Sequence, residues 1–430
     1  MELKVFVIIG SGVFGASTAL HLARTKPQSR IILIDRKAFP DPSAASSDLN
    51  KIIRTEYDDL LYMRLALKAR KAWKEDPLYA PFFHEAAMVT LENSGVSQRV
   101  IKLFKDLSVE PEAQMLPVQV LQSRYGNLLD QTALEGVEEV YVNPLSGWAE
   151  ASAALDKVVE AALQEGAELV KADITQILFN AAGDCTGVRA ADGQTFEASH
   201  VILATGPGSI ELIASSEPHR VDFRIQDRLL AAAVVSGVVK LNKEDRAQFD
   251  PLPIFVHDLG DIYGEVLPPT KDGYLKFASE TPFKNTVYHA KSGQTLSIPP
   301  SQYDHQDQDS VPPYLENECS RIFKDIFGTH FQNLSFESYR VCWDAYTPDE
   351  DFIVAPHPNC QGLYFAIAGS FHSWKFLPIL GELVGNMIDG TLDTTLAKRW
   401  AWDRQMPTEG GGGMFPKREW CDIVKDEKDH

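Results

Sequence analysis

The sequence predicts an α/β fold in which a nucleotide-binding domain is interrupted by a β-rich domain. Near the N-terminus an apolar strand runs into a glycine-rich turn and then a helix, as in a dinucleotide-binding unit. Buried strands of the same type return near residues 200 and 365. Residues 219–344 contain runs that alternate between apolar and polar side chains, which is typical of β-strands. The nucleotide-binding domain is therefore expected to be discontinuous.

The first unit has the order strand, glycine turn, helix, strand and acid, in VFVIIGSGVFG and the later run RIILID. Gly10 is expected to make the tight bend, Gly12 to let the backbone approach a pyrophosphate, and Gly15 to let helix and strand pack closely. The N–H groups at the helix N-terminus would bind the phosphates. Asp35 ends the second strand, where a carboxylate accepts hydrogen bonds from ribose hydroxyls. The residues expected to contact the dinucleotide are Gly10, Gly12, Val13, Phe14, Gly15 and Asp35.

The elements that follow are predicted from hydrophobic period and from chain breakers. Residues 40–50 are polar and rich in turn formers, which indicates a loop. Helices are expected at 62–74, 150–165, 316–327 and 377–388, where apolar residues recur every three or four positions. Strands are expected at 168–170, 174–179, 187–190, 200–206 with its glycine turn, 229–238, 273–277 and 363–367. A hairpin is expected at Asp192-Gly193, and a flexible linker at 410–413.

This interleaving predicts the division of the chain into domains. The nucleotide-binding domain is expected to comprise residues 1–85, 148–218 and 345–405, the β-rich substrate domain residues 86–147 and 219–344, and the C-terminal tail residues 406–430. Such a discontinuous arrangement is more typical of flavin enzymes than of nicotinamide dehydrogenases, whose two halves are usually contiguous.

Composition restricts the class of partner. With 430 residues, 44% of them hydrophobic and 23% charged, the chain is expected to be a globular protein of two or three domains. A net charge of −19 argues against nucleic acid or an anionic membrane surface as the main partner. No apolar run approaches the roughly 18 residues of a membrane helix. The five cysteines lack metal-ligand spacing, and their odd number fits a reducing compartment, so we expect no metal and a cytoplasmic location, with the peroxisome as the alternative.

Five segments resemble those of a known family. They are VFVIIGSGVFGASTALHLA, the loop SSDLNKIIR, HVILATG, YRVCWDAYTPDEDFIVAPHP and GSFHSWKFLPILGELVG. The chain from Val5 to about Arg404 thereby resembles the sarcosine oxidase and fructosyl amino acid oxidase (amadoriase) family of flavoproteins. The resemblance implies an FAD-binding domain of the glutathione-reductase or D-amino-acid-oxidase type, with an inserted β-rich substrate domain. It also implies oxidation of the N–Cα bond of N-substituted amino acids, with a hydride passing to FAD and the electrons returning to O2 as H2O2.

The family often ties its flavin covalently to a cysteine. Cys342 lies at the position that resembles this residue, seven residues before Asp349 in C-x-x-x-x-x-P-D. A buried structural cysteine is the alternative. The resemblance therefore implies an FAD attached through Cys342.

Two residues of the run GYLKFASE match functional positions of the family. Lys276 matches a lysine beneath the flavin, where a fixed positive charge favours electron transfer to O2; the alternative is a lysine on a solvated strand face. Glu280 stands where fructosyl amino acid oxidases carry a glutamate that binds sugar hydroxyls and sarcosine oxidases carry a histidine. A carboxylate suits a polyol because it accepts several hydroxyl hydrogens. An exposed glutamate at a strand end is the alternative.

Two cations match positions that hold the substrate carboxylate. Lys375 matches the lysine of this role, and Arg54 matches an arginine of sarcosine oxidases, whose bidentate fork a lysine lacks. For Arg54 the alternative is a surface ion pair. The glycine and serine turn before Lys375 is expected to direct N–H groups at the flavin. The further residues expected to contact the flavin are Ser47, Asn50, Lys51, Gly206, Cys342, Asp349, Gly369, Ser370, His372 and Lys375.

The substrate is left open between several N-substituted amino acids. Fructosyl amino acids are favoured, with sarcosine, L-pipecolate and L-saccharopine as alternatives, because Arg54 is a sarcosine-type feature and Glu280 a fructosyl-type feature. A nicotinamide-dependent dehydrogenase and a non-catalytic flavin-binding protein are the other hypotheses. The expected partners are the small-molecule substrate and O2, and the chain is expected to act as a monomer.

Overall fold

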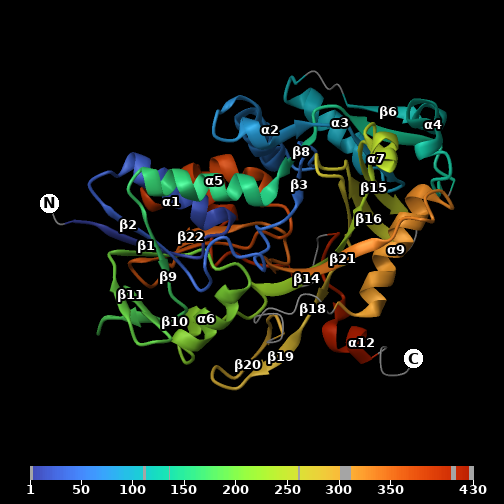
Figure 1. The fold of residues 1–430 in the computed structure, drawn as a ribbon. Helices are drawn as coiled ribbons and strands as arrows, with labels where there is room; N and C mark the ends of the chain where they lie inside the picture. The colour runs from blue at the N-terminus through green and yellow to red at the C-terminus, as the bar shows by residue number, and fades with distance from the viewer. Residues whose placement is uncertain are drawn as a thin grey trace.

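A parallel sheet lies at the centre of one half of the computed structural model, which describes residues 3–109, 113–134, 136–259, 262–300, 311–407 and 413–425 (Figure 1). Within these residues its strand order is β22 (Ile353–Pro356), β23 (Leu363–Ile367), β13 (His200–Leu203), β1 (Val5–Ile9), β2 (Arg30–Asp35) and β9 (Glu168–Lys171). Neighbouring strands are parallel except β22 and β23. Strands from three distant segments of the chain thus build one sheet, as the recurrence of buried strands predicted.

Both faces of this sheet are covered, which explains its almost continuously apolar strands. Alternate residues of β1, Phe6 and Ile8, pack on one face against the helices α1 (Val13–Thr25), α5 (Ala151–Gln164) and α10 (Leu377–Ile388). Val7 and Ile9 face the other side, towards α6 (Gly208–Ser216). In Figure 1 α1 and α5 lie above the strands and α6 lies below them. The small antiparallel sheet on that side comprises β10 (Ile174–Phe179), β11 (Cys185–Ala190) and β12 (Thr195–Glu197).

A second, mostly antiparallel sheet forms the other half of the molecule. In the described part of the chain its order is β24 (Arg418–Glu419), β18 (Phe283–Lys284), β14 (Leu230–Lys240), β17 (Tyr274–Ser279), β16 (Ile262–Leu267), β15 (Ile254–Leu259), β5 (Met88–Glu92), β7 (Glu139–Asn143) and β6 (Gln114–Pro117). The long strand β21 (Phe336–Tyr346) also pairs with β14, from Leu230 opposite Tyr346 to Val239 opposite Phe336. Helix α9 (Pro313–Phe327) packs on one face of this sheet through Ile322, Ile326 and Phe327.

Smaller elements join the two halves. A three-stranded sheet has the order β3 (Asn50–Ile53), β8 (Gly147–Glu150) and β4 (Phe83–Glu85), and a hairpin comprises β19 (Thr286–His289) and β20 (Gln294–Ser297). The other helices are α2 (Leu60–Glu75), α3 (Val96–Asp106), α4 (Val118–Tyr125), α7 (Lys243–Phe249), α11 (Thr394–Arg399) and α12 (Trp420–Lys425). The loop of residues 40–50 leads into β3 of this sheet. It lies close to the second sheet, since Lys276 of β17 donates hydrogen bonds to Asp48 and Asn50.

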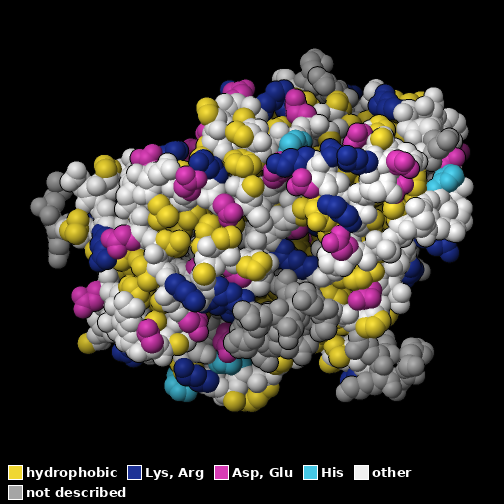
Figure 2. Space-filling view, in the orientation of Figure 1, with side chains coloured by type: hydrophobic (Ala, Val, Ile, Leu, Met, Phe, Trp, Pro, Cys, Tyr) yellow, Lys and Arg dark blue, Asp and Glu magenta, His cyan; other side chains and the backbone are white. Residues whose placement is uncertain are grey.

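Most predicted elements are present. The strand at 363–367 and the helix at 377–388 have the predicted bounds, and the hairpin at Asp192-Gly193 joins β11 to β12. The C-terminal part differs from the expected tail, because β24 pairs with β18 and α12 follows it. Most of the predicted linker at 410–413 lies outside the described residues. No described helix is both long and apolar enough to cross a membrane. On the face shown in Figure 2, acidic and basic side chains are interspersed.

Candidate active site and cofactor site

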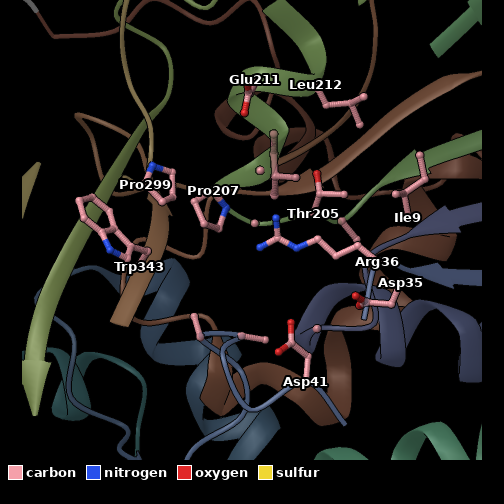
Figure 3. Close-up of a pocket in the computed structure, with 18 of the residues that line it drawn as sticks. Ile9, Asp35, Arg36, Asp41, Thr205, Pro207, Glu211, Leu212, Pro299 and Trp343 are labelled. Carbon is pink, nitrogen blue, oxygen red and sulfur yellow. The ribbon is translucent and has the colours of Figure 1, made fainter. Parts of the chain in front are cut away.

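A cavity of about 650 Å³ lies at the carboxyl ends of β1, β2 and β13. Ligands of open α/β sheets bind at this edge. Figure 3 shows Asp35 and Arg36 at one end of the cavity, and Trp343 and Pro299 at the other. Of the residues predicted to contact the dinucleotide, the cavity is lined by Gly10, Gly12, Val13, Phe14, Asp35 and Gly206.

The turn between β1 and α1 requires glycine at positions 10 and 15. Gly10 has a φ of +98°, and a Cβ there would lie 2.3 Å from the carbonyl oxygen of Ala204. A Cβ on Gly15 would lie 1.8 Å from the carbonyl oxygen of Gly10. No side chain fits at either position, so Gly15 allows α1 to pack closely on the turn, as predicted. Gly12 is the N-cap residue of α1 and lines the cavity, so the helix N-terminus faces the cavity, where an anion would be favoured.

Asp35 is held in place by a residue that the sequence analysis passed over. Its Oδ2 atom accepts hydrogen bonds from the backbone N–H and the hydroxyl of Ser11, at 2.7 and 2.6 Å. Its other carboxylate oxygen is approached by the backbone N–H of Lys37, at 3.4 Å. Ser11 therefore orients the carboxylate towards the cavity that both Asp35 and Lys37 line.

Two side chains have buried polar atoms without a partner: one at the end of the loop that lines the cavity, and one in the cavity wall. Asn50 is fully buried, and both its Nδ2 and its Oδ1 atoms lack a hydrogen-bond partner among the described residues. The Nε1 atom of Trp343, a residue that lines the cavity, also lacks one. Leaving buried donors and acceptors unpaired is costly, so a ligand with its own polar groups suits this position. The glycine turn, Asp35 and these side chains together fit FAD.

One face of the second sheet carries the charged candidates. Residues directly opposite one another in paired strands point to the same face. Glu265 lies opposite Ala278, which lies opposite Ser236, and Ser236 lies opposite Arg340. Cys342, Lys276 and Glu280 share this polar face, because each is two residues from one of these positions. The opposite face packs into apolar clusters that include Phe277 with α9 and Val341.

Lys276 is held by the loop that precedes β3. Its Nζ donates to Oδ2 of Asp48 at 2.6 Å and to the carbonyl oxygen of Asn50 at 3.1 Å. The Nζ of Lys51 reaches the same Asp48 oxygen at 2.8 Å. Burial lowers the pKa of Lys276, an effect that Asp48 opposes and Lys51 reinforces. Burial alone would also raise the pKa of Asp48, but Lys276 and Lys51 hold it well below its usual range.

The same loop is fixed by Arg340 of β21. Its guanidinium donates to the backbone carbonyl oxygens of Ser47 and Ala44, the latter at 2.6 Å. The hydroxyl of Ser47 also bonds to that of Ser152 at 3.0 Å. The loop predicted to pack on the flavin is thus bound to both halves of the molecule, which sets the positions of Asn50 and Lys51.

A chain of hydrogen bonds links Lys375, Tyr57 and His372. The Nζ of Lys375 donates to the Tyr57 hydroxyl at 3.0 Å and to the His372 carbonyl oxygen at 2.9 Å. The Tyr57 hydroxyl lies 3.0 Å from Nδ1 of His372, whose Nε2 lies 2.8 Å from the carbonyl oxygen of Glu350. Because that carbonyl only accepts, Nε2 carries the hydrogen and Nδ1 accepts from Tyr57. Burial and, in addition, Arg54 lower the pKa of Lys375.

Arg54 lies beside the same tyrosine. Its guanidinium carbon is 4.6 Å from the centre of the Tyr57 ring, and one of its nitrogens donates to the carbonyl oxygen of Glu56. Guanidinium has five N–H donors, so most of them stay available for a ligand. The structure therefore brings Arg54 and Lys375 together around Tyr57, as their proposed common role requires.

Glu280 has a second carboxylate, Glu265, as a neighbour. Burial and the charge of Glu265 raise the pKa of Glu280 to about 8, although Arg54, Lys51 and Lys276 pull it down. Burial also raises the pKa of Glu265 against the same three cations. Neither carboxylate makes a hydrogen bond to a described residue. Both side chains are only partly exposed. Glu280 is therefore not the fully exposed glutamate that was considered as the alternative.

Two further predicted residues, Cys342 and Asp349, lie in different surroundings. Cys342 is buried on the polar face of β21, and its charge interaction with Lys51 indicates that the two lie close together. Asp349 makes a bidentate ion pair with Arg404, at 2.8 Å for both contacts, so its visible role is structural. No described cluster of three or more His, Cys, Asp or Glu side chains is arranged to hold a metal ion.

The turn before Lys375 differs from its expected role. The N–H groups of residues 370–373 bond to other protein atoms, among them Phe371 to Oδ2 of Asp344 at 2.9 Å and His372 to the carbonyl oxygen of Gly369. These N–H groups are therefore not directed at a flavin. Asp344, a partly exposed carboxylate, lines the cavity, and desolvation raises its pKa. Ser370 is buried and lies in the left-handed region, with its hydroxyl oxygen accepting from the Thr347 N–H at 3.2 Å.

The residues of the site that sequence reasoning missed include Ser11, Tyr57, Glu265, Arg340, Trp343 and Asp344. Tyr57 follows Arg54 closely in the loop, so an aromatic side chain beside a candidate cation was an available signal. Glu265 and Arg340 each interrupt an apolar run, which by itself predicts an exposed position. Pairing of β21 with the distant β14 brings Arg340 to the site, and pairing of β16 with the neighbouring β17 brings Glu265 there.

Known proteins resemble this chain over most of its length. A profile of the family described as "FAD dependent oxidoreductase" matches residues 6–387. The chain is 27% identical over 422 residues to L-saccharopine oxidase of Schizosaccharomyces pombe, covering 93% of each protein. It is 23% identical over 392 residues to human peroxisomal sarcosine oxidase, covering 88% of this chain and 90% of that protein.

Solved structures of similar fold include a fructosyl peptide oxidase from E. terrenum, with a TM-score of 0.84 and 24% identity over 98% of this chain and 97% of that one. Fructosamine oxidase (Amadoriase II) of Aspergillus fumigatus has a TM-score of 0.82 and 22% identity over 98% and 96%. The predicted fold class, an FAD-binding α/β domain with a β-rich partner, is confirmed by this likeness and by the two sheets.

Proposed function

The chain belongs to the FAD dependent oxidoreductase family, and from this premise we propose that it oxidises the N–Cα bond of N-substituted amino acids. The protein is an FAD-dependent oxidoreductase of the amine-oxidase type, related to oxidases of amino-acid-like substrates. Within the proposal, fructosyl amino acids are the favoured substrates. Sarcosine, L-pipecolate and L-saccharopine are the alternatives.

The observation that carries the proposal is the presence of two cations, the buried Lys375 and the partly exposed Arg54, near two carboxylates. Lys375 and Arg54 flank Tyr57, and Glu265 and Glu280 lie on the facing sheet. Arg54 interacts electrostatically with Glu280, so the two groups are near one another. An amino acid with a substituent on nitrogen has a carboxylate for the cations and further hydrogen-bond donors for the carboxylates. This match favours such a substrate over a simple alcohol or hydroxy acid.

FAD would be held by the residues that line the cavity. The turn from Gly10 to Gly15 and the N-terminus of α1 would hold the pyrophosphate, Asp35 the ribose, and the Asn50 region the ring. Bound FAD would supply the acceptor for a hydride from Cα and the means of passing electrons to O2. A covalent link through Cys342 is part of the proposal, supported by its burial on the same face as Lys276.

The protein's own residues then have distinct roles. Arg54 and Lys375 would hold the substrate carboxylate, and the hydrogen bonds from Lys375 to Tyr57 and His372 fix its ammonium group. Glu280 would accept hydrogens from a polar nitrogen substituent. Lys276, held by Asp48, would keep a positive charge where O2 is reduced to H2O2. Burial excludes water from these charges and thus strengthens their interactions.

A peroxide assay with a panel of fructosyl and N-alkyl amino acids tests the proposal. We expect H2O2 formation with at least one member. The variant Lys375→Ala should lower kcat/KM for every substrate alike, by about thirtyfold to several thousandfold, since losing one contact to a buried charge costs roughly 2–5 kcal/mol. The exposed Lys398→Ala serves as the matched control. No peroxide with any member, from protein that contains flavin, would contradict the proposal.

A further inference from the structure

Glu265 occupies a central position on the polar face of the second sheet. On β16 it lies opposite Ala278 of β17, and Lys276 and Glu280 flank Ala278 by two residues on either side. The three charged side chains therefore share one face, with Glu265 diagonal to both of the others. The backbone N–H of Glu280 donates to the carbonyl oxygen of Tyr263 at 2.8 Å, which extends this register beyond β17. Glu265 thus lies between the lysine proposed to act on O2 and the glutamate proposed to contact the substrate.

The charged groups around Glu265 come from several elements. Those that interact with it electrostatically are Lys276 of β17, Lys51 and Asp48 of β3 and its preceding loop, and Arg54 of the loop after β3. Glu280 and Lys375 also interact with Glu265. A carboxylate surrounded by several cations would normally bond to one of them, yet Glu265 has no hydrogen bond to any described residue.

The other buried groups of the site are already engaged as donors or acceptors. Lys276 donates to Asp48, and Lys375 donates to Tyr57 and to the His372 carbonyl. His372 is fixed in one neutral form, because Nδ1 accepts from Tyr57 and Nε2 donates to Glu350. Each of these groups is thus already hydrogen-bonded to another part of the protein. The carboxylates of the two glutamates, which make no hydrogen bond to a described residue, remain available to accept a proton.

The pair is suited to holding a proton. Burial raises the pKa of both carboxyls. The charge of Asp48 adds to this rise for Glu265, and the charge of Glu265 adds to it for Glu280, whose pKa is raised to about 8. Two neighbouring carboxylates do not both ionise readily, so they share protons as a unit. Glu280 is proposed to contact the nitrogen substituent of the substrate, so Glu265 is the member of the pair that is left to receive the proton.

We propose that Glu265 is the proton acceptor for the substrate's ammonium group and keeps that proton until O2 is reduced. The inference rests on the proposed function, since it needs a secondary amine as substrate. An ammonium nitrogen has no lone pair to push a hydride from Cα, so its proton must leave first. The N–H bond breaks, its proton goes to a Glu265 oxygen, and the C–H electron pair leaves as hydride to the flavin.

The reaction then balances without a proton from solvent. The substrate loses one proton and one hydride and becomes an iminium ion. O2 gains two electrons and two hydrogens: the hydride, by way of the flavin, and the proton from Glu265. The products are the iminium ion, which is hydrolysed, and H2O2, and Glu265 returns to its ionised form.

Anaerobic mixing of the flavin-loaded enzyme with its best substrate, in weak buffer with a pH-indicator dye, tests this role. In the unaltered protein the flavin absorbance should fall with no proton released. Glu265→Gln, which keeps the shape of the side chain, should release one proton per flavin reduced. Its rate of flavin bleaching at saturating substrate should fall about tenfold for each pH unit below the amine pKa. The unaltered protein should lack this dependence, and Glu265→Asp should restore part of its behaviour.

Two controls separate a role in proton transfer from a loss of structure. Glu337→Gln, at an exposed position of β21, should behave as the unaltered protein. The flavin spectrum and the Tm of Glu265→Gln should match those of the unaltered protein. If a substrate is oxidised but the dye reports the same proton release and the same pH profile for Glu265→Gln and the unaltered protein, the inference is wrong and the proposed function stands. If no amine reduces the flavin of the unaltered protein, both are wrong.

Discussion

Lys276 is a buried cation whose ammonium group bonds to Asp48 and to a backbone carbonyl. At the residue scale this arrangement separates two halves of the proposed reaction. A positive charge at this point stabilises negative charge that develops on O2 and has no comparable effect on hydride loss from the substrate. Lys276→Met should therefore leave reduction of the flavin by substrate nearly unchanged and slow its reoxidation by O2 by about a hundredfold to a thousandfold.

Stopped-flow absorbance of the two half-reactions, measured separately, checks this prediction. The exposed Lys324→Met on α9 is the control and should change neither rate. Equal slowing of both half-reactions would instead assign Lys276 a structural role through its ion pair with Asp48.

Cys342 gives a second prediction at this scale. If the flavin is attached through its sulfur, acid precipitation should leave the yellow colour in the pellet, and Cys342→Ser should move it to the supernatant. Cys421 is exposed, so Cys421→Ser should leave the colour in the pellet. Flavin that extracts freely from the unaltered protein would refute attachment and leave FAD binding itself untouched.

Glu280 discriminates among the candidate substrates. Its carboxylate would accept hydroxyl hydrogens of a sugar, and such a charged hydrogen bond contributes about 1.5–3 kcal/mol. Glu280→Gln should thus lower kcat/KM for fructosyl amino acids by roughly tenfold to a hundredfold and leave sarcosine and L-pipecolate within a few fold. An equal loss of kcat/KM for all substrates would contradict the sugar-binding role of Glu280 and favour N-alkyl amino acids as the substrates.

At the element scale, the turn between β1 and α1 permits little variation. A methyl group on Gly15 would overlap with the carbonyl oxygen of Gly10. Gly15→Ala must therefore push α1 away from the sheet. Overpacking of this kind costs about 1–3 kcal/mol. The variant should show a lower Tm and a lower flavin content per protein chain. Gly413→Ala has no atom within 4 Å of the added carbon and is the control, for which the flavin ratio should not change.

Elements that follow from local pattern could be predicted from the sequence, whereas pairings over long distances could not. The glycine turn, α10 and the hairpin of β11 and β12 each follow from residues within a short window. The pairing of β21 with β14 joins segments about a hundred residues apart, and no local period reports it. Arg340 reaches the site only through this pairing, whereas Glu265 lies on β16, which pairs with its neighbours in the chain, β15 and β17. Arg54 and Lys375 were found because family-like motifs surround them.

At the scale of the whole molecule, a buried histidine makes stability depend on pH. His357 is 4% exposed, and burial lowers its pKa to about 4, although Asp222 opposes the shift. Its Nδ1 accepts from the Asn359 N–H at 3.2 Å, so protonation there would break that bond. The unfolded chain binds a proton near pH 6.5 and the folded chain near pH 4. The contribution of His357 to the free energy of unfolding is therefore full above pH 6.5 and declines as the pH falls towards 4.

The predicted loss of stability on acidification can be measured. Between pH 8 and pH 5 the His357 contribution should decrease by about 2 kcal/mol. Urea unfolding of His357→Gln should show a smaller difference in unfolding free energy between these two pH values. The exposed His219→Gln should retain the difference of the unaltered protein. Equal pH dependence in both variants would show that other groups dominate acid sensitivity.

The interleaved strand order also constrains how the protein is made. On the ribosome, β1 emerges first, but its neighbour β13 follows only at His200–Leu203 and β23 only at Leu363–Ile367. The second sheet gains its edge strand β24 within a few residues of the last ones described. At about 5–20 residues per second, the apolar β1 and α1 wait tens of seconds for their partners. Synthesis of this protein should therefore depend on chaperones that shield the nascent N-terminal segment, and flavin should be captured only after β23 has been synthesised.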